Sequence, residues 1–88
     1  ASVEFSPSTT GDNTVFELVA ADQPGLLSKI GRVFIEQSVD IEAAKIMTIG
    51  ERAEDVFYIC RESGGPLDEA EQAELRSALL ARIDSDLG

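Results

Sequence analysis

The stretch with the clearest potential for chemistry is Asp22-Gln23-Pro24-Gly25-Leu26-Leu27, which follows an extended apolar run and opens an amphipathic helical pattern. A strand that turns directly into a helix leaves the first helical N–H groups without partners, and together with the helix dipole these groups can hold a carboxylate. Gly25 would leave room for a ligand, and Pro24 would preset a helix-compatible backbone. The alternative is that Asp22 or Gln23 only caps the helix.

Catalytic chemistry has few candidates in this chain. There is no histidine, and the single cysteine, Cys60, has no partner for an internal disulfide. Without a histidine to activate it, Cys60 is interpreted as a buried, reduced structural thiol of a cytoplasmic protein. Glu54 and Asp55 are adjacent in an extended segment, so their side chains point to opposite faces and make poor acid–base partners. We therefore expect no catalytic residue here.

Acidic residues dominate the charge of the chain, with 17 Asp and Glu against 7 Lys and Arg and a net charge of −10. This balance argues against nucleic acid and against an anionic membrane, because phosphate binding needs clustered Lys and Arg. No apolar run approaches a membrane span, and no signal peptide opens the chain. An acidic run lies at the start of the second predicted helix and consists of Asp68, Glu69, Glu71 and Glu74. It could form a metal site or, more simply, a solvated face that complements the helix dipole, and we expect no metal.

Hydrophobic periodicity predicts the elements that must position the turn. Helices are expected over 26–37 and from Asp68, which with Glu71 has the spacing of a capping box, to about Ile83. The alternation within 41–49 slips, so either a bulge shifts the register or both faces are partly covered. The predicted strands are 3–5, 14–21, 41–49 and 56–60, which pair as two hairpins.

The order strand, strand, helix, strand, strand, helix predicts a single two-layer α+β domain over 1–88, with a four-stranded antiparallel sheet and both helices on one face. Its core is expected over 14–83, with 1–13 as an additional strand and loop and 84–88 as a frayed tail. Strands that are apolar on both faces predict that another copy or domain covers the helix-free face. The start without a methionine indicates a piece of a longer protein.

Three segments make the chain resemble the ACT domain family: V-A-A-D-Q-P-G-L-L at 19–27, I-E-A-A-K-I at 41–46 and T-I-G-E-R-A-E-D-V-F at 48–57. More closely, they resemble the C-terminal ACT domain of bifunctional uridylyltransferase/uridylyl-removing enzymes, the glutamine sensors that act on PII nitrogen-regulatory proteins. The resemblance covers about 14–83 and implies a ferredoxin-like ACT sandwich. That family has the order βαββαβ, whereas no strand pattern follows the second helix here. The strand at 3–5 is therefore expected to replace the usual last strand beside 14–21.

The resemblance implies that glutamine binds at the turn, with its carboxylate on the amides of Gly25, Leu26 and Leu27. Its ammonium group would meet Asp22, or Asp40 of a facing ACT domain. The family often has an asparagine near Asp40, and an ionised aspartate there can accept a hydrogen bond but cannot donate one. Residues of the strand from Ile41 to Ile46 would contact the side-chain amide of the bound glutamine. Because ACT sites commonly form between two domains, one chain is expected to carry half a site.

The function implied by the resemblance is regulatory glutamine sensing that controls transferase against hydrolase activity, with no activity in this chain alone. The expected partners are glutamine, a second ACT domain, the catalytic domains of the parent chain and, through the parent, PII protein. No cofactor is expected in this domain, whereas the parent would use Mg²⁺ and UTP. The alternative is a docking or dimerisation module that binds no metabolite and would tolerate a bulky residue at Gly25.

Overall fold

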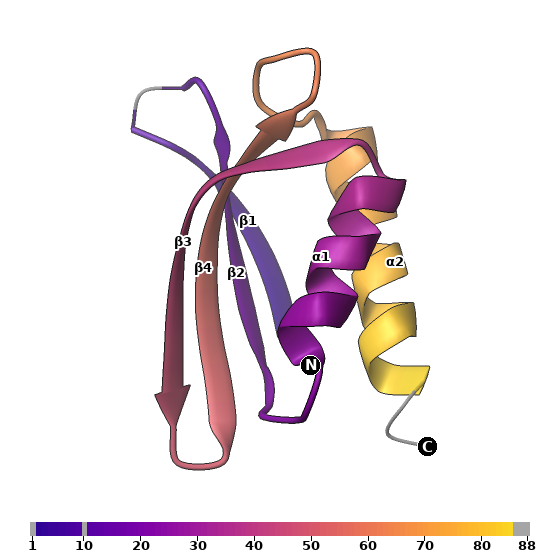
Figure 1. Cartoon of the computed structure of the whole chain (residues 1–88). Helices are drawn as coiled ribbons and strands as arrows, with labels where there is room; N and C mark the ends of the chain where they lie inside the picture. Colours follow the sequence, from indigo (N-terminus) through magenta and orange to yellow (C-terminus); the bar gives the residue numbers. More distant parts are fainter. Residues whose placement is uncertain (1, 10, 86–88) are drawn as a thin grey trace.

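Four strands and two helices make up the fold, in a computed structural model that describes residues 2–9 and 11–85. Figure 1 shows the strands as one sheet, with both helices packed side by side on the same face. The predicted two-layer α+β architecture and the ββαββα order are confirmed. The elements are β1 (Ser2–Pro7), β2 (Thr14–Ala21), α1 (Leu26–Glu36), β3 (Val39–Ile49), β4 (Arg52–Arg61) and α2 (Glu69–Ser85).

The sheet has the strand order β1-β2-β4-β3, and all neighbours are antiparallel. β1 lies at one edge beside β2, with Ser2 opposite Val19 and Pro7 opposite Thr14. The N-terminal strand β1 therefore lies beside β2, as predicted, and takes the position that a strand following α2 would otherwise have. At the other edge β3 leaves one side of its backbone unpaired within the described chain.

The second hairpin is longer than predicted, because its strands continue almost to the turn. β4 begins at Arg52 and pairs there with Ile49, so only Gly50 and Glu51 separate the strands. Gly50 has φ 63°, a left-handed conformation that glycine adopts without strain. The register shifts between Ile41 and Ala43, which supports the first of the two interpretations of this strand, a bulge.

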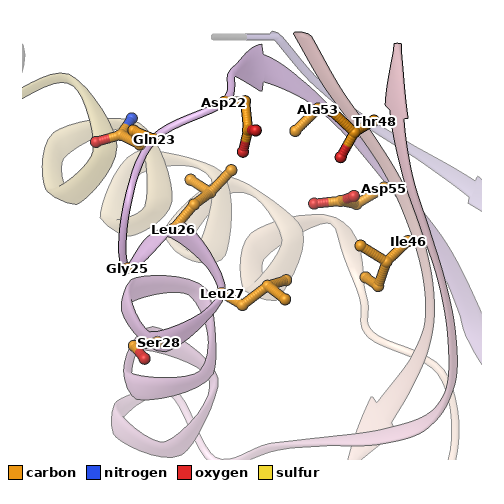
Figure 2. Close-up of a pocket in the computed structure, with 10 residues that line it drawn as sticks. All are labelled: Asp22, Gln23, Gly25, Leu26, Leu27, Ser28, Ile46, Thr48, Ala53 and Asp55. Carbon is orange, nitrogen blue, oxygen red and sulfur yellow. The ribbon is translucent and has the colours of Figure 1, made fainter. Parts of the chain in front are cut away.

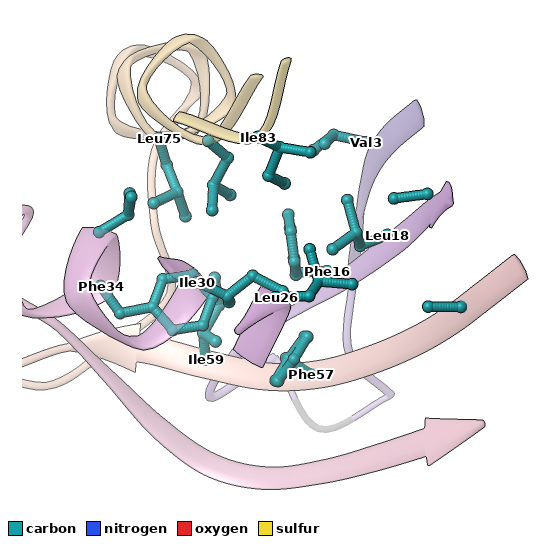
Figure 3. Packing of buried hydrophobic residues seen from close by; sticks show 14 of the residues in the cluster. Val3, Phe16, Leu18, Leu26, Ile30, Phe34, Phe57, Ile59, Leu75 and Ile83 are labelled. Carbon is teal, nitrogen blue, oxygen red and sulfur yellow. The ribbon is translucent and has the colours of Figure 1, made fainter. Parts of the chain in front are cut away.

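The hydrophobic core lies between the helices and the inner face of the sheet (Figure 3). Phe16, Phe34 and Phe57, from β2, α1 and β4, form a triangle whose ring centroids are 5.6 to 5.7 Å apart. Every second residue of β2 is buried, as its alternation predicts. The α2 stripe closes the other side of the core through Leu75, Leu79 and Ile83, all fully buried.

The start of α2 confirms the predicted capping box. The Glu71 amide donates to the Asp68 carboxylate at 2.8 Å, and the Asp68 amide donates to the Glu71 carboxylate at 2.9 Å. The helix continues through Ser85, which is two residues into the predicted frayed tail, and 86–88 lie outside the described residues. Neither of the helices described is long and apolar enough to cross a bilayer.

Unlike β2 and β4, the edge strand β3 is exposed along nearly its whole length. Its inward-facing positions alternate with the outward-facing ones, yet both sets remain open to solvent. The side chain of Leu27, in the first turn of α1, is likewise half exposed. The helices therefore leave β3 largely uncovered, and a cleft lies between the start of α1 and this edge of the sheet.

Candidate functional site

The turn between β2 and α1 is held by two backbone hydrogen bonds. The Asp22 amide donates to the Glu51 carbonyl at 2.9 Å, which ties the turn to the β3–β4 hairpin. The Leu26 amide donates to the Gln23 carbonyl at 3.3 Å, which closes a four-residue turn around Pro24-Gly25. Gly25 has φ 78° and ψ 8°, the conformation that the third residue of a type II turn requires. The glycine is therefore needed by the backbone itself.

Helix α1 starts without a side-chain cap. Gly25 is the N-cap residue, and its carbonyl accepts the first helical hydrogen bond from the Lys29 amide at 3.0 Å. The interpretation that Asp22 or Gln23 caps the helix is therefore wrong. The Gln23 side chain instead accepts a hydrogen bond from Lys29 Nζ at 2.9 Å. The left-handed turn places the helix start at Leu26, too far along for either side chain to cap it.

The amide groups at this helix start are only partly engaged. Leu26 donates within the turn, so its N–H group is removed from the predicted set of carboxylate donors. Within the described residues, no acceptor is found for the amides of Gly25, Leu27 and Ser28. Helix starts with unsatisfied N–H groups attract anionic groups. The available donors thus extend one residue further into the helix than predicted, to Ser28.

A cleft of about 340 Å³ lies beside these amides, between the start of α1 and the ends of β3 and β4 (Figure 2). Five of the predicted site residues line it together, and Pro24 lies in the same turn but outside the lining. The lining residues are Asp22, Gln23, Gly25, Leu26, Leu27, Ser28, Ile46, Thr48, Ala53 and Asp55.

Two predicted site residues, Asp40 and Ile41, lie away from this cleft. They pair with Cys60 and Ile59 near the start of β3, at the opposite end of the strand from the turn. The six residue steps of extended chain from Asp40 to Ile46 span about 20 Å. Within one chain the structure does not bring Asp40 or Ile41 to the cleft, so their predicted role concerns only a facing domain.

Asp55 is the charged cleft residue that sequence reasoning missed. Only 1% of its surface is exposed, and its Oδ1 atom has no hydrogen-bond partner in the described structure. Burial raises the pKa of the Asp55 carboxyl, a hydrogen bond from the Met47 amide lowers it, and the nearby Asp22 carboxylate raises it. A signal was present in the sequence, because Asp55 shares its strand parity with the buried residues Ala53 and Phe57. A carboxylate on the inward face of a strand requires an explanation.

The charges around the cleft favour a ligand that carries both a carboxylate and a hydrogen-bond donor. Its lining includes the carboxylates of Asp22 and Asp55 but neither Lys nor Arg. Such a lining disfavours phosphates and other strong anions. The free amides of Leu27 and Ser28 nevertheless suit one carboxylate group. Donors at the helix start and acceptors on the strands together match the two ends of an amino-acid zwitterion.

The acidic run at the start of α2 has a structural explanation. Asp68 and Glu71 form the capping box, and the Arg61 guanidinium lies 3.4 Å from Asp68 and 2.7 Å from Glu71. Among residues 2–9 and 11–85, no group of three or more candidate ligands could hold a metal ion. Cys60 is buried, and burial together with Glu42 raises the pKa of its thiol, which disfavours the reactive thiolate.

Comparisons with known proteins identify relatives of most of the chain. The model of the ACT domain family matches residues 14–77. A bifunctional uridylyltransferase/uridylyl-removing enzyme of Photobacterium profundum is 52% identical over 81 residues, which are 92% of this chain and 9% of that protein. The protein of the same name from Vibrio campbellii is 46% identical over 85 residues, 97% of this chain and 10% of its own length. The chain thus spans about a tenth of these relatives.

One solved structure supports the fold alone. The crystal structure of an unknown protein from Galdieria sulphuraria matches with a TM-score of 0.63 at 13% sequence identity. The match covers 78% of this chain and 37% of that chain.

Proposed function

The chain belongs to the ACT domain family, and we propose that it is the glutamine-sensing regulatory domain of a bifunctional uridylyltransferase/uridylyl-removing enzyme. In this proposal, glutamine binding shifts the parent enzyme between the transferase and hydrolase reactions on PII protein in the cytoplasm. The catalytic chemistry, with its expected use of Mg²⁺ and UTP, would reside in the remaining nine-tenths of such an enzyme.

The observation that carries the proposal is the cleft beside the uncapped start of α1 (Figure 2). The α-carboxylate of glutamine would accept hydrogen bonds from the free amides of Leu27 and Ser28. Its ammonium group would lie at the exposed Asp22 carboxylate on the other side of the turn. The volume of about 340 Å³ lies at the small end of the usual range for ligand pockets, about 300–1,000 Å³. It suits an amino acid better than a nucleotide.

A few such contacts are sufficient for a metabolite sensor. Millimolar affinity corresponds to about −4 kcal/mol of binding free energy. Two backbone hydrogen bonds to a carboxylate and one ion pair supply contributions of this size. Control of a distant active site would require a coupling free energy of roughly 1–3 kcal/mol between the ligand and the domain arrangement.

A second ACT domain would complete the site in this proposal. The cleft is open beside β3, whose outer edge has no partner strand in the described chain. Exposed apolar side chains lie along this strand, including Ile41 and Ile46. A facing domain would cover them, and its own Asp40 would contact the ammonium group of the ligand, as the resemblance implies.

The second candidate function is a docking or dimerisation module for the catalytic domains or for PII. The observation in its favour is the exposure of Met47, Ile49 and Tyr58, because the helices leave that face of the sheet uncovered. Tolerance of a bulky residue at Gly25 no longer distinguishes the two functions. The positive φ of Gly25 makes such a residue unfavourable with or without a ligand.

Titration of the chain with glutamine, followed by amide NMR shifts, tests the proposed function. Glutamate and asparagine serve as controls. Saturable shifts centred on Asp22, Leu27 and Ser28, with a preference for glutamine, are expected. Absence of any shift at tens of millimolar glutamine, both for this chain and for a tandem of two ACT domains from one enzyme, would leave docking as the better explanation.

A further inference from the structure

Asp55 is buried at the floor of the cleft, with an acceptor atom that nothing in the described chain satisfies. Figure 2 shows its side chain projecting from β4 into the space between the sheet and the start of α1. It faces Leu26 and Leu27 across that space, whereas Asp22 lies at the mouth. Gln23, which also has an unpaired buried amide nitrogen, directs its side chain to the other side of the turn.

The two oxygens of Asp55 have different surroundings. The Met47 backbone amide of β3 is close enough to lower the pKa of this carboxyl, whereas Oδ1 has no hydrogen-bond partner among the described residues. A buried carboxylate that serves only structure is ordinarily paired with Arg, Lys or several donors. None of the described residues that line this cleft is basic. An unpaired acceptor in a lined cleft therefore indicates a donor that arrives with a ligand.

We propose, building on the function proposed above, that Asp55 selects the side chain of the bound amino acid: its Oδ1 accepts a hydrogen bond from the N–H₂ of a carboxamide. The carboxylate and ammonium of an amino acid share one carbon atom. When the helix amides and Asp22 hold these groups at the mouth, only the ligand's side chain extends to the floor. The half-exposed Leu27 side chain and Ile46 flank this path and have room to adjust.

This arrangement explains how one cleft distinguishes glutamine from ligands of similar size. The side-chain carboxylate of glutamate has no N–H group and would meet Asp55 with like charge. An apolar side chain of the same length would leave Oδ1 unpaired. Sites built to hydrogen-bond a ligand group reject analogues that lack it far more strongly than apolar pockets do.

The substitution Asp55→Asn provides a direct test, because it removes the charge and replaces one of the two acceptor oxygens with an N–H₂ group. With the asparagine oxygen on the side of the Met47 amide, its N–H₂ group would face the cleft. The N–H₂ donor of the asparagine would then replace the Oδ1 acceptor of Asp55. Removal of a buried hydrogen-bond partner changes affinity by about tenfold or more, so glutamine binding should weaken by this factor. Glutamate binding should strengthen at the same time.

Glu54→Gln is the matched control, because it makes the same charge change one residue away. Glu54 points to the opposite face of β4, where it lies 3.3 Å from Arg52. The glutamine-to-glutamate affinity ratio should fall in Asp55→Asn and stay unchanged in Glu54→Gln. Both ratios come from amide NMR titrations of the 88-residue chain with each amino acid.

The possible outcomes separate the inference from the proposed function. If the native chain binds glutamine and Asp55→Asn keeps the native ratio, the role of Asp55 is overturned and the proposed function stands. An equal fall in both variants would assign the effect to net charge and would also overturn it. If neither the native chain nor a tandem of two ACT domains from one enzyme binds either amino acid, the proposed function and this inference fall together.

A measurement on the native chain guards against a variant that does not fold. The ¹³C shift of the Asp55 side-chain carboxyl reports its hydrogen bonds and its protonation directly. We expect this shift to change saturably with glutamine, at the same concentrations as the amides of Leu27 and Ser28. A carboxyl shift that stays constant while those amides saturate would overturn the inference.

Discussion

The two helices differ in how the backbone amides of their first turns are satisfied. At α2, Asp68 and Glu71 satisfy each other's backbone amides, and acidic residues occupy the first turn. At α1, Gly25 offers no side chain, no acidic residue occupies the first turn, and the amides of Leu27 and Ser28 have no acceptor within the described residues.

The difference separates a stabilising helix start from one that is available for binding. A capping box satisfies donors that would otherwise destabilise the helix terminus. The tight turn before α1 leaves the same kind of donors open and directs them at a cleft lined by two carboxylates. Ligand affinity should therefore respond to substitutions at the start of α1 and hardly at all to those at the start of α2, whereas stability should respond at both.

The largest expected effect is on the turn before α1. Gly25→Val forces a β-branched residue into the left-handed region, which costs roughly 1–3 kcal/mol of unfolding free energy. Urea denaturation measures this loss. Gly31→Ala is the control, because Gly31 lies within α1 with open space around it and should gain about 1 kcal/mol. Equal stability of Gly25→Val and the native chain would contradict the turn geometry.

Removal of the α2 cap should produce the next largest effect. Asp68→Ala leaves the Glu71 amide without its acceptor and should lower the unfolding free energy by about 1 kcal/mol. Glutamine affinity should not change. Glu69→Ala, next to the cap but outside the box, is the matched control and should lose less. A weaker response to glutamine in Asp68→Ala would show that the two helix starts are coupled.

Ser28→Glu would make the start of α1 resemble that of α2. A carboxylate in the first turn complements the helix dipole and should raise the unfolding free energy by about 0.5 kcal/mol. The same charge would compete with the ligand carboxylate for the free amides, so glutamine affinity should fall by about tenfold. Ser77→Glu, on the exposed middle of α2, is the control for both measurements. Unchanged affinity in Ser28→Glu would remove the amides from the site.

The smallest effects concern pH. As the pH falls, the contribution of Glu71 to the unfolding free energy should decrease, whereas that of Asp55 should increase. Hydrogen bonds from Arg61 and the Asp68 backbone lower the pKa of Glu71, so its contribution to stability is present above the ordinary glutamate pKa, about 4.3, and is lost as the pH falls through the lowered value. Burial raises the pKa of Asp55, so the folded state binds its proton more readily, and this contribution grows as the pH falls through the raised value.

Urea midpoints of the native chain, Glu71→Gln and Asp55→Asn from pH 7 to pH 3 measure both effects. Relative to the native chain, Glu71→Gln should be less stable at pH 7, and the difference should shrink on acidification. Asp55→Asn should be more stable at pH 7, and its advantage should also shrink. An Asp55→Asn variant that is less stable than the native chain at pH 7 would indicate that the ionised carboxylate has a partner in the folded state.

Local patterns predicted much of the fold correctly. The alternation of Phe16 and Leu18 placed β2, and the spacing of Asp68 and Glu71 identified the cap. The imperfect alternation within 41–49 allowed a bulge as one of two interpretations, and the register shift between Ile41 and Ala43 fits it. The start of β4 was missed because charged residues from Arg52 onward conceal an extended segment that the pairing with β3 imposes. Long-range pairing overrides local preference in such segments.

The candidate site was only partly accessible to sequence reasoning. The turn from Asp22 to Leu27 was found, because its glycine and proline are local signals. Asp55 was set aside because its neighbour in the chain faces the other way, although its inward parity placed it with the core. Asp40 was grouped with the turn through the resemblance, whereas the direction of β3 carries it to the far end of the sheet.

Periodicity and short-range spacing were sufficient for the element order, the architecture and the turn, because these depend on contacts between residues close in the chain. The cleft arises differently, from three segments that meet only after the sheet has formed. The pairing of β3 with β4 places Ile46 and Thr48 beside Asp55, and the packing of α1 brings Leu27 opposite them. Only tertiary structure shows that one Asp55 oxygen lacks a donor among the described residues, because whether a buried group is satisfied depends on every element around it.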